Sequence, residues 1–183
     1  NSSKWSNTEK LMLSETIAID TEFSLIVPVL VNNHNDYFVV DTKEEASSAL
    51  TLLKTNKKGK TGFICLDSIP DVKKPDSEQI EEISNNLTNN NSNNKIIGWF
   101  SEIVRVDEKI RNVLRLIYDG LLVVTNNCDI DYIFKNTSVT SVVTVNGEYY
   151  HKSGVIRGGS ISEGETARIG KKEKMDNLKI LIS

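Results

Sequence analysis

The spacing of apolar residues near the start of the chain predicts a helix. Four of them between residues 20 and 31 recur at the i, i+3, i+4 and i+7 positions of one helix face. Asp20 or Thr21 stands where a capping residue is expected. Pro28 lacks a backbone N–H and clashes with the preceding turn, so we expect a kink or an early end. The four apolar residues are Phe23, Ile26, Val27 and Leu30.

The next segments alternate between strand and helix patterns. Residues 37–40 form a short apolar run after a turn-forming stretch, which predicts a buried strand. Thr42 and Glu45 have the spacing of a capping box, in which each side chain satisfies a backbone N–H. The helix should end near Asn56, and residues 63–66 predict a second strand. The apolar face of this predicted helix consists of Ala46, Ala49, Leu50 and Leu53.

Residues 141–160 carry a strong hairpin signal. Asn146-Gly147 between two apolar runs predicts a type I′ turn, in which both central residues have positive φ. The segment then ends in Gly154, Gly158 and Gly159. Two interpretations of these glycines stay open: a flexible exit loop, or a surface against which the backbone of a second chain lies.

The two halves of the chain look alike. Between them, residues 68–95 form a connector rich in proline and asparagine, with room for a short helix over residues 77–84. Adding 87 to the residue number matches several positions of the first half to the second. The matches are Ser14 with Ser101, Glu15 with Glu102, Asp20 with Asp107, and the first helix face with Ile110, Val113, Leu114 and Ile117.

The strands follow the same repeat with smaller offsets. Residues 37–40 match 121–124, and residues 63–66 match 142–145. Each half therefore reads helix, strand, helix, strand. Because one such unit has few residues with which to build a core, we expect two units packed together. The glycine hairpin and the tail have no counterpart in the first half.

Composition is that of a globular chain. Its 183 residues and 38% hydrophobic content predict one domain or two small subdomains. No apolar run suits a membrane span or a signal peptide, and the absence of an initiating Met predicts a piece of a longer protein. The net charge of −3 argues against nucleic-acid binding by the chain as a whole. Cys65 and Cys128 are isolated and are expected to be reduced thiols.

The chain carries no convincing set of catalytic residues. Gly59-Lys60-Thr61 has the end of a phosphate loop but lacks its first glycine, and it precedes a strand instead of following one. His34 and His151 have no Cys, Ser or Asp constellation beside them. Helix capping explains Asp20 and Asp107 more simply than paired catalytic carboxylates. We therefore expect no enzyme, no cofactor, no metal and no small-molecule substrate.

Basic residues gather in the turn at residues 57–60 and at the start of a helix predicted from about residue 171. One interpretation is a solvated face balanced by acidic neighbours. The other is contact with phosphates, because lysines at a helix start oppose the helix dipole. The second group consists of Arg168, Lys171, Lys172 and Lys174.

Three motifs in order resemble the hinge domain of the structural maintenance of chromosomes (SMC) family, most closely the bacterial chromosome partition SMC. The run VVTVNGEYYHKSGVIRGGS at residues 142–160 is similar to the pattern that closes these hinges. TGFICLD at residues 61–67 and YFVVD at residues 37–41 resemble two of the family's strands. Together they cover most of the chain from about Leu11 to Ser160.

The resemblance implies an α/β (α+β) fold of two pseudo-repeated helix-strand-helix-strand subdomains, with coiled-coil roots at both termini. The implied divisions are an entry segment 1–13, subdomain I 14–73, a connector 74–95, subdomain II 96–160 and an exit segment 161–183.

In function, the resemblance implies the dimerisation hinge of a cytoplasmic, nucleoid-associated SMC ATPase that organises chromosomes, with the ATPase in a head domain elsewhere in the parent. The chain would form a homodimer, touch DNA near the arm junction and meet no membrane. The implied interface is Ser153, Gly154, Val155, Ile156, Arg157, Gly158, Gly159 and Ser160, and the implied DNA contacts are Arg168, Lys171, Lys172 and Lys174. The alternative is a nucleic-acid-binding module whose dimerisation is incidental.

Overall fold

The first half of the chain folds as short helices around a two-stranded parallel sheet. The structure is a computed structural model and describes residues 10–30, 37–56, 60–88 and 95–159. The predicted strands are confirmed to within one residue at each end, with Val39 opposite Ile64. The elements are α1 (Leu13–Thr16), the 3-10 turn η1 (Thr21–Phe23), α2 (Ile26–Leu30), β1 (Phe38–Val40), α3 (Lys43–Thr55), β2 (Phe63–Cys65) and η2 (Leu66–Ser68).

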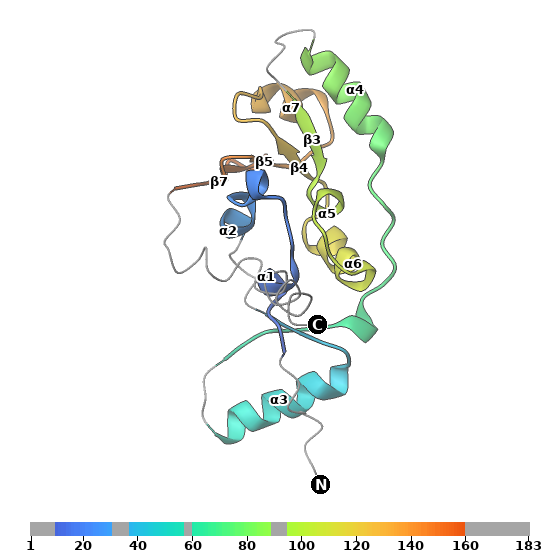
Figure 1. The fold of residues 1–183 in the computed structure, drawn as a ribbon, viewed down its shortest axis with the longest axis vertical. Helices are drawn as coiled ribbons and strands as arrows, with labels where there is room; N and C mark the ends of the chain where they lie inside the picture. Colours follow the sequence, from blue (N-terminus) through green and yellow to red (C-terminus); the bar gives the residue numbers. More distant parts are fainter. Residues whose placement is uncertain (1–9, 31–36, 57–59, 89–94, 160–183) are drawn as a thin grey trace, which may run out of the picture.

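The second half forms a five-stranded mixed sheet in the order β3-β4-β5-β6-β7. β4 and β5 are parallel, and the other neighbouring pairs are antiparallel. Figure 1 shows α4 along the outside of β3, at the opposite end of the molecule from α3. The elements are α4 (Ser77–Thr88), β3 (Ile96–Trp99), α5 (Phe100–Ile103), α6 (Glu108–Ile117), β4 (Leu121–Val124), α7 (Ile130–Asn136), β5 (Ser141–Thr144), β6 (Tyr149–His151) and β7 (Ile156–Arg157).

At the start of α3, Thr42 and Glu45 each satisfy a backbone N–H as predicted, although the carboxylate bonds the residue before the N-cap. Thr42 Oγ1 accepts a hydrogen bond from Glu45 N at 3.3 Å, and the Glu45 carboxylate accepts from Asp41 N at 3.0 Å. Glu45 also pairs with Lys10 Nζ at 3.0 Å. The bond from Lys10 is the main cause that holds the pKa of Glu45 below its usual value. This one side chain therefore starts the helix and ties it to the segment that precedes α1.

The predicted helix around Pro28 is broken into two pieces, and the break precedes the proline. η1 ends at Phe23 and α2 begins at Ile26, so Pro28 lies in the first turn of α2, where a backbone N–H has no acceptor within the helix. Asp20 occupies the N-cap position of η1, but its side chain makes no capping bond and pairs with Arg105 at 2.9 Å instead. Asp107 likewise makes no side-chain capping bond to α6, so the capping explanation of both aspartates was wrong.

The two faces of the second sheet are buried against different helices. On one face, Leu121, Val123 and Val143 pack into a cluster with residues of α1, α2 and α6. On the other face, Leu122 and Val142 pack against α4 and α7. Successive strand residues point to opposite faces, so β4, which is covered on both sides, is apolar at all four positions, while β5 is apolar at its two central ones.

The connector contains more structure than its composition predicted. α4 runs four residues beyond the expected residue 84 and buries Ile83 and Leu87 against the sheet. Trp99 Nε1 donates a hydrogen bond to the carbonyl oxygen of Asp76 at 3.0 Å, just before this helix. The connector therefore covers one face of the sheet, because the helical spacing of its few apolar residues gives it an apolar side.

The internal repeat is confirmed as a two-fold arrangement. Residues matched by adding 87 occupy matching elements, since α1 corresponds to α5, and η1 with α2 corresponds to α6. Ala18 and Arg105 are such a matched pair, and they bond to each other in both directions, N to O, at 3.0 and 2.7 Å. Two equivalent residues can exchange bonds in this way only where the pseudo-two-fold axis passes between them.

The halves share one core. The cluster under the first face of the sheet takes buried residues from α1 and α2 of the first half and from α5, α6, β4 and β5 of the second. The division into subdomains 14–73 and 96–160 stays a prediction. The coiled-coil roots predicted at 1–13 and 161–183 lie almost wholly outside the described residues.

The hairpin at Asn146-Gly147 forms, but not with the predicted type I′ turn. Thr144 N donates to Glu148 O and Gly147 N donates to Thr144 O, both at 2.9 Å, which leaves three residues in the loop. A three-residue loop of this kind places a left-handed residue at its end, and Gly147 has φ +78°. β6 and β7 repeat the pattern, with Gly154 N bonded to His151 O and φ +93° at Gly154.

Replacing Gly147 by alanine should destabilise the fold more than the same change at Gly120. Both residues have positive φ, but a Cβ at Gly120 meets open space, whereas one at Gly147 collides with the carbonyl oxygen of Leu25. We expect Gly120→Ala to lower the free energy of unfolding by about 1 kcal/mol and Gly147→Ala by about 3 kcal/mol, measured by urea unfolding. Equal losses would contradict this contact between the halves.

Candidate dimerisation surface

The last strand of the sheet presents exposed apolar side chains at an open edge. Among the described residues, β7 pairs with β6 alone. Ile156 is 69% exposed and Val155, just before the strand, is 43% exposed. An exposed apolar edge strand is a template for pairing with another chain.

A single row of side chains crosses the whole sheet and ends at this edge. The strand register places Trp99 opposite Leu122, Leu122 opposite Val142, Val142 opposite Tyr150 and Tyr150 opposite Ile156. Trp99, Leu122 and Val142 are buried, Tyr150 is half-buried and Ile156 is mostly exposed. The apolar row therefore leaves the core at β7 with no cover from the described part of the chain.

The glycines around β7 leave the surface beside them open. A Cβ at Gly154 or Gly159 would meet nothing within 4 Å, and both have positive φ. Gly158 has no such φ, and its added Cβ would come no closer than 3.6 Å, to Glu148. Packing among the described residues therefore gives no reason for glycine at position 158.

Seven of the eight predicted interface residues lie together in the turn and strand that end the sheet, and Ser160 lies outside the described residues. Ser153 caps the turn through His151, whose Nδ1 lies 3.1 Å from Ser153 N. Arg157 lies over the ring of Tyr149, at 5.6 Å from its centroid. The predicted DNA residues Arg168, Lys171, Lys172 and Lys174 also lie outside the described residues.

A second open edge, which sequence reasoning missed, is found on β2. The repeat matches β2 to β5, and the pairing of Phe38 with Phe63 corresponds to that of Leu122 with Val142. β5 receives β6 on its far side, but β2 pairs with β1 alone among the described strands. The sequence did contain a signal for this open edge, because the hairpin that covers β5 in the second half has no counterpart in the first half.

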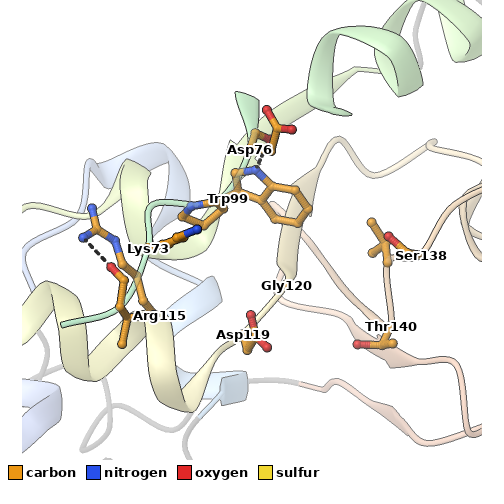
Figure 2. A pocket seen from close by; sticks show the side chains of 11 residues that line it. Lys73, Asp76, Trp99, Arg115, Asp119, Gly120, Ser138 and Thr140 are labelled. Carbon is orange, nitrogen blue, oxygen red and sulfur yellow. Dashed lines mark hydrogen bonds between the residues drawn. The ribbon is translucent and has the colours of Figure 1, made fainter. Parts of the chain in front are cut away.

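The pocket in Figure 2 lies at the end of the sheet where β4 and β5 begin. It encloses about 340 Å³, with Lys73 and Arg115 on one side and Ser138 and Thr140 on the other. The carbonyl oxygen of Thr140 accepts from Lys152 N at 2.8 Å, so the pocket adjoins the β6–β7 turn. Its lining includes no histidine or cysteine, and its ionisable side chains are those of Lys73, Asp76, Arg115 and Asp119.

Arg115 forms the best-buried ion pair described in the second half. Its guanidinium binds both carboxylate oxygens of Glu102, at 2.8 and 3.1 Å, and also Glu108 Oε1 at 3.0 Å. The bonds from Arg115 lower the pKa of Glu102, although burial opposes them. Side-chain exposure is 10% for Arg115, 20% for Glu102 and 68% for Glu108. The pair with Glu102 therefore joins α5 to α6 in a partly dehydrated setting.

Within the described ranges, no three His, Cys, Asp or Glu side chains gather as a metal site. In the same ranges, no helix has the length and apolarity to cross a bilayer.

Burial raises the pKa of the Cys128 thiol to about 11, which keeps it protonated and unreactive at neutral pH.

The structure defines a class of domain: an α+β fold of two related halves that ends at an open sheet edge. The chain belongs to the SMC hinge family, because the model described as SMC proteins Flexible Hinge Domain matches residues 10–127. The Chromosome partition protein Smc of Fusobacterium nucleatum is 28% identical over 165 residues. That alignment covers 89% of this chain and 13% of the relative, so the chain spans a small part of the relative's length.

Solved hinge domains have the same fold. An asymmetric dimer of the Geobacillus stearothermophilus SMC hinge domain gives a TM-score of 0.67 at 19% identity, over 94% of this chain and 67% of that chain. The Pyrococcus furiosus SMC hinge domain gives 0.57 at 23% identity, over 84% and 77%. The α+β class predicted from the sequence is therefore confirmed.

Replacing Glu102 by glutamine should weaken the fold and flatten its response to acid. Because the folded-state pKa of Glu102 is lowered, its stabilisation is present above about pH 4.3, the ordinary value, and is lost as the pH falls through the folded value. At pH 7 we expect Glu102→Gln to cost about 2 kcal/mol and Glu108→Gln less than about 1 kcal/mol. Urea unfolding at pH 7 and pH 3 measures both, and equal costs at pH 7 would contradict the assignment.

Proposed function

We propose that this chain is the dimerisation hinge of an SMC ATPase that organises chromosomes. The apolar row that leaves the core at Ile156 carries the proposal, because its last side chain is 69% exposed at an open edge. Two further observations support it: no described residue would come within 4 Å of a Cβ at Gly159, and none would come closer than 3.6 Å to a Cβ at Gly158. The interface uses residues 153–160, as the sequence predicts.

The open edge of β2 is the proposed receiving surface on the partner. In the second half the matching strand, β5, is paired on its far side by an antiparallel strand. A partner's β7 can supply the same pairing to β2, and the reciprocal contact follows from two-fold symmetry. A stable interface built from the two contacts should bury at least about 1,000 Å² in total.

The parent protein is proposed to be longer than this chain at both ends, with coiled-coil arms leading to an ATPase head. Relatives named Chromosome partition protein Smc support this, since the chain covers 13% of one of them. The corresponding location is the cytoplasm, on the nucleoid. The hinge itself has no part in the chemistry of ATP in this proposal.

DNA contact near the arm junction is the finer part of the proposal. Four basic residues within seven positions of the sequence support it: Arg168, Lys171, Lys172 and Lys174. The net charge of −3 confines such binding to a local patch. The competing function, a nucleic-acid-binding module whose dimerisation is incidental, rests on the same four residues.

Replacing Ile156 by aspartate should convert the dimer into a monomer without unfolding the chain. The side chain is mostly exposed in one chain, so its loss costs the fold little, while a charge would be buried in the interface. Gly158→Val should have the same effect, because among the described residues an added Cβ comes no closer than 3.6 Å, to Glu148, and the fold should tolerate the change. Sedimentation equilibrium of the 183-residue chain measures the mass.

The matched control is Leu116→Asp on α6, which is 49% exposed and far from β7 in the sequence. This variant should stay dimeric. A dimer that survives Ile156→Asp and Gly158→Val, or a monomeric wild type, would reject the proposed hinge.

Neutralising the basic cluster should weaken DNA binding and leave the dimer intact. Replacing Lys171, Lys172 and Lys174 by glutamine removes three phosphate contacts, so binding should fall and its dependence on salt should become shallower. Mobility shifts with single- and double-stranded DNA at two salt concentrations measure this, with Lys43, Lys54 and Lys109, which lie outside both basic clusters, replaced as a control. Equal loss in the two triple variants would argue against a local DNA site.

A further inference from the structure

The pocket in Figure 2 combines apolar walls with a small number of polar side chains. Trp99 and Val139 are buried, and Val72 and Pro75 of the connector are half-buried. These four residues form the apolar part of the lining. The volume of about 340 Å³ lies near the lower end of the roughly 300–1,000 Å³ typical of small-ligand sites. The pocket therefore has the size for a small molecule with an apolar group.

Two side chains of opposite charge line the pocket without pairing. Lys73 comes from the connector, and Asp119 comes from the turn between α6 and β4. Both are exposed, they form no ion pair with each other, and neither side chain is hydrogen-bonded to a residue that the structure describes. Figure 2 shows them apart, on two sides of the pocket. A ligand that carries both charges can therefore join them where the side chains themselves do not meet.

The other two charged side chains of the lining already have partners. Arg115 binds both carboxylate oxygens of Glu102, at 2.8 and 3.1 Å. Asp76 lies just before α4, where one carboxylate oxygen accepts from Glu78 N at 2.9 Å and the carbonyl oxygen accepts from Trp99 Nε1 at 3.0 Å. These bonds hold the walls of the pocket in place and leave the first pair of charges for a ligand.

Two hydroxyl groups add hydrogen-bonding capacity to the pocket. Ser138 and Thr140 lie in the loop between α7 and β5, are exposed, and have no side-chain hydrogen bond to a described residue. Figure 2 shows both on the side of the pocket away from Lys73. A hydroxyl both donates and accepts, and an ammonium group has three N–H donors. An ammonium bound to Asp119 can therefore donate to a hydroxyl as well.

A molecule with both charges fits this arrangement better than a simple anion or a simple cation. An anion attracted to Lys73 is repelled by the Asp119 carboxylate, and a cation attracted to Asp119 is repelled by the Lys73 ammonium. A zwitterion satisfies both side chains at once. Lys73 has a flexible four-carbon stem, so its ammonium can adjust to the spacing of the two charges in the ligand.

We propose that this pocket binds a zwitterionic α-amino acid with an apolar side chain. Lys73 binds the carboxylate, Asp119 and Thr140 bind the ammonium, and the apolar side chain lies against Trp99. Pairs of exposed charges are weak, so the dissociation constant should be on the order of 1 mM. No lining residue belongs to residues 153–160, so the proposal stands apart from the proposed function.

The test is a titration of the 183-residue chain with three compounds: leucine, N-acetyl-leucine, which lacks the ammonium, and leucine amide, which lacks the carboxylate. Binding is followed by the amide proton resonances of Gly120 and Thr140 and by the indole N–H resonance of Trp99, since all three residues line the pocket. Leucine should bind about fivefold more tightly than either analogue, because each analogue loses one exposed ion pair.

Two variants separate the two charges. Lys73→Gln should remove the preference for leucine over leucine amide and keep the preference over N-acetyl-leucine, because it removes the partner of the carboxylate. Asp119→Asn should have the reverse effect, because it removes the partner of the ammonium. The matched controls are Lys74→Gln and Asp131→Asn, at exposed positions that do not line the pocket, and both should keep the wild-type preferences.

Resonances that do not move at leucine concentrations about twentyfold above the expected constant would overturn the proposal. Equal binding of the three compounds, or unchanged preferences in Lys73→Gln and Asp119→Asn, would also overturn it. Tightest binding of N-acetyl-leucine would indicate an anion site, and tightest binding of leucine amide would indicate a cation site, and either result rejects a zwitterion site. The oligomeric state of the chain bears on the hinge and not on this pocket.

Discussion

The shared core between the two repeats is the constraint on which the structure depends. Neither half has the residues to cover both faces of a sheet, so α1 and α2 of the first half are buried with α5 and α6 of the second against β4 and β5. The reciprocal bonds of Ala18 and Arg105 fix the two halves about their pseudo-two-fold axis. Removing either half would expose the apolar side of the other.

The two repeats have diverged at a buried ion pair and at one edge of the sheet. The second half holds Arg115 in a bidentate pair with Glu102, whereas the position that matches Arg115 in the first half is Pro28. The second half also carries β6 and β7, while the matching edge of β2 has no such strand among the described residues. One molecule thus presents both an added strand and an edge without one, which is the complementarity that a symmetric dimer requires.

Local signals in the sequence predicted much of this fold. Periodicity and the Thr42–Glu45 capping box located α3 almost to the residue, and the offset of 87 residues identified the repeat before any coordinates. The signals failed where distant contacts compete with local preference. Asn146-Gly147 lies in a three-residue loop, in which Gly147 takes the left-handed conformation at the end and packs against the backbone of Leu25. α4 extends beyond its predicted end because the sheet offers it an apolar face.

By itself, the sequence determined the α+β class, the duplication and the family, because each is written in patterns of neighbouring residues or in a repeat of them. Only the tertiary structure decided which strands are edges, that Ile156 ends a row beginning at Trp99, and that the nitrogen of His151 accepts from Ser153. An edge is defined by which strands lie beside it, and strand pairing joins residues too far apart in the chain for any local pattern to encode it.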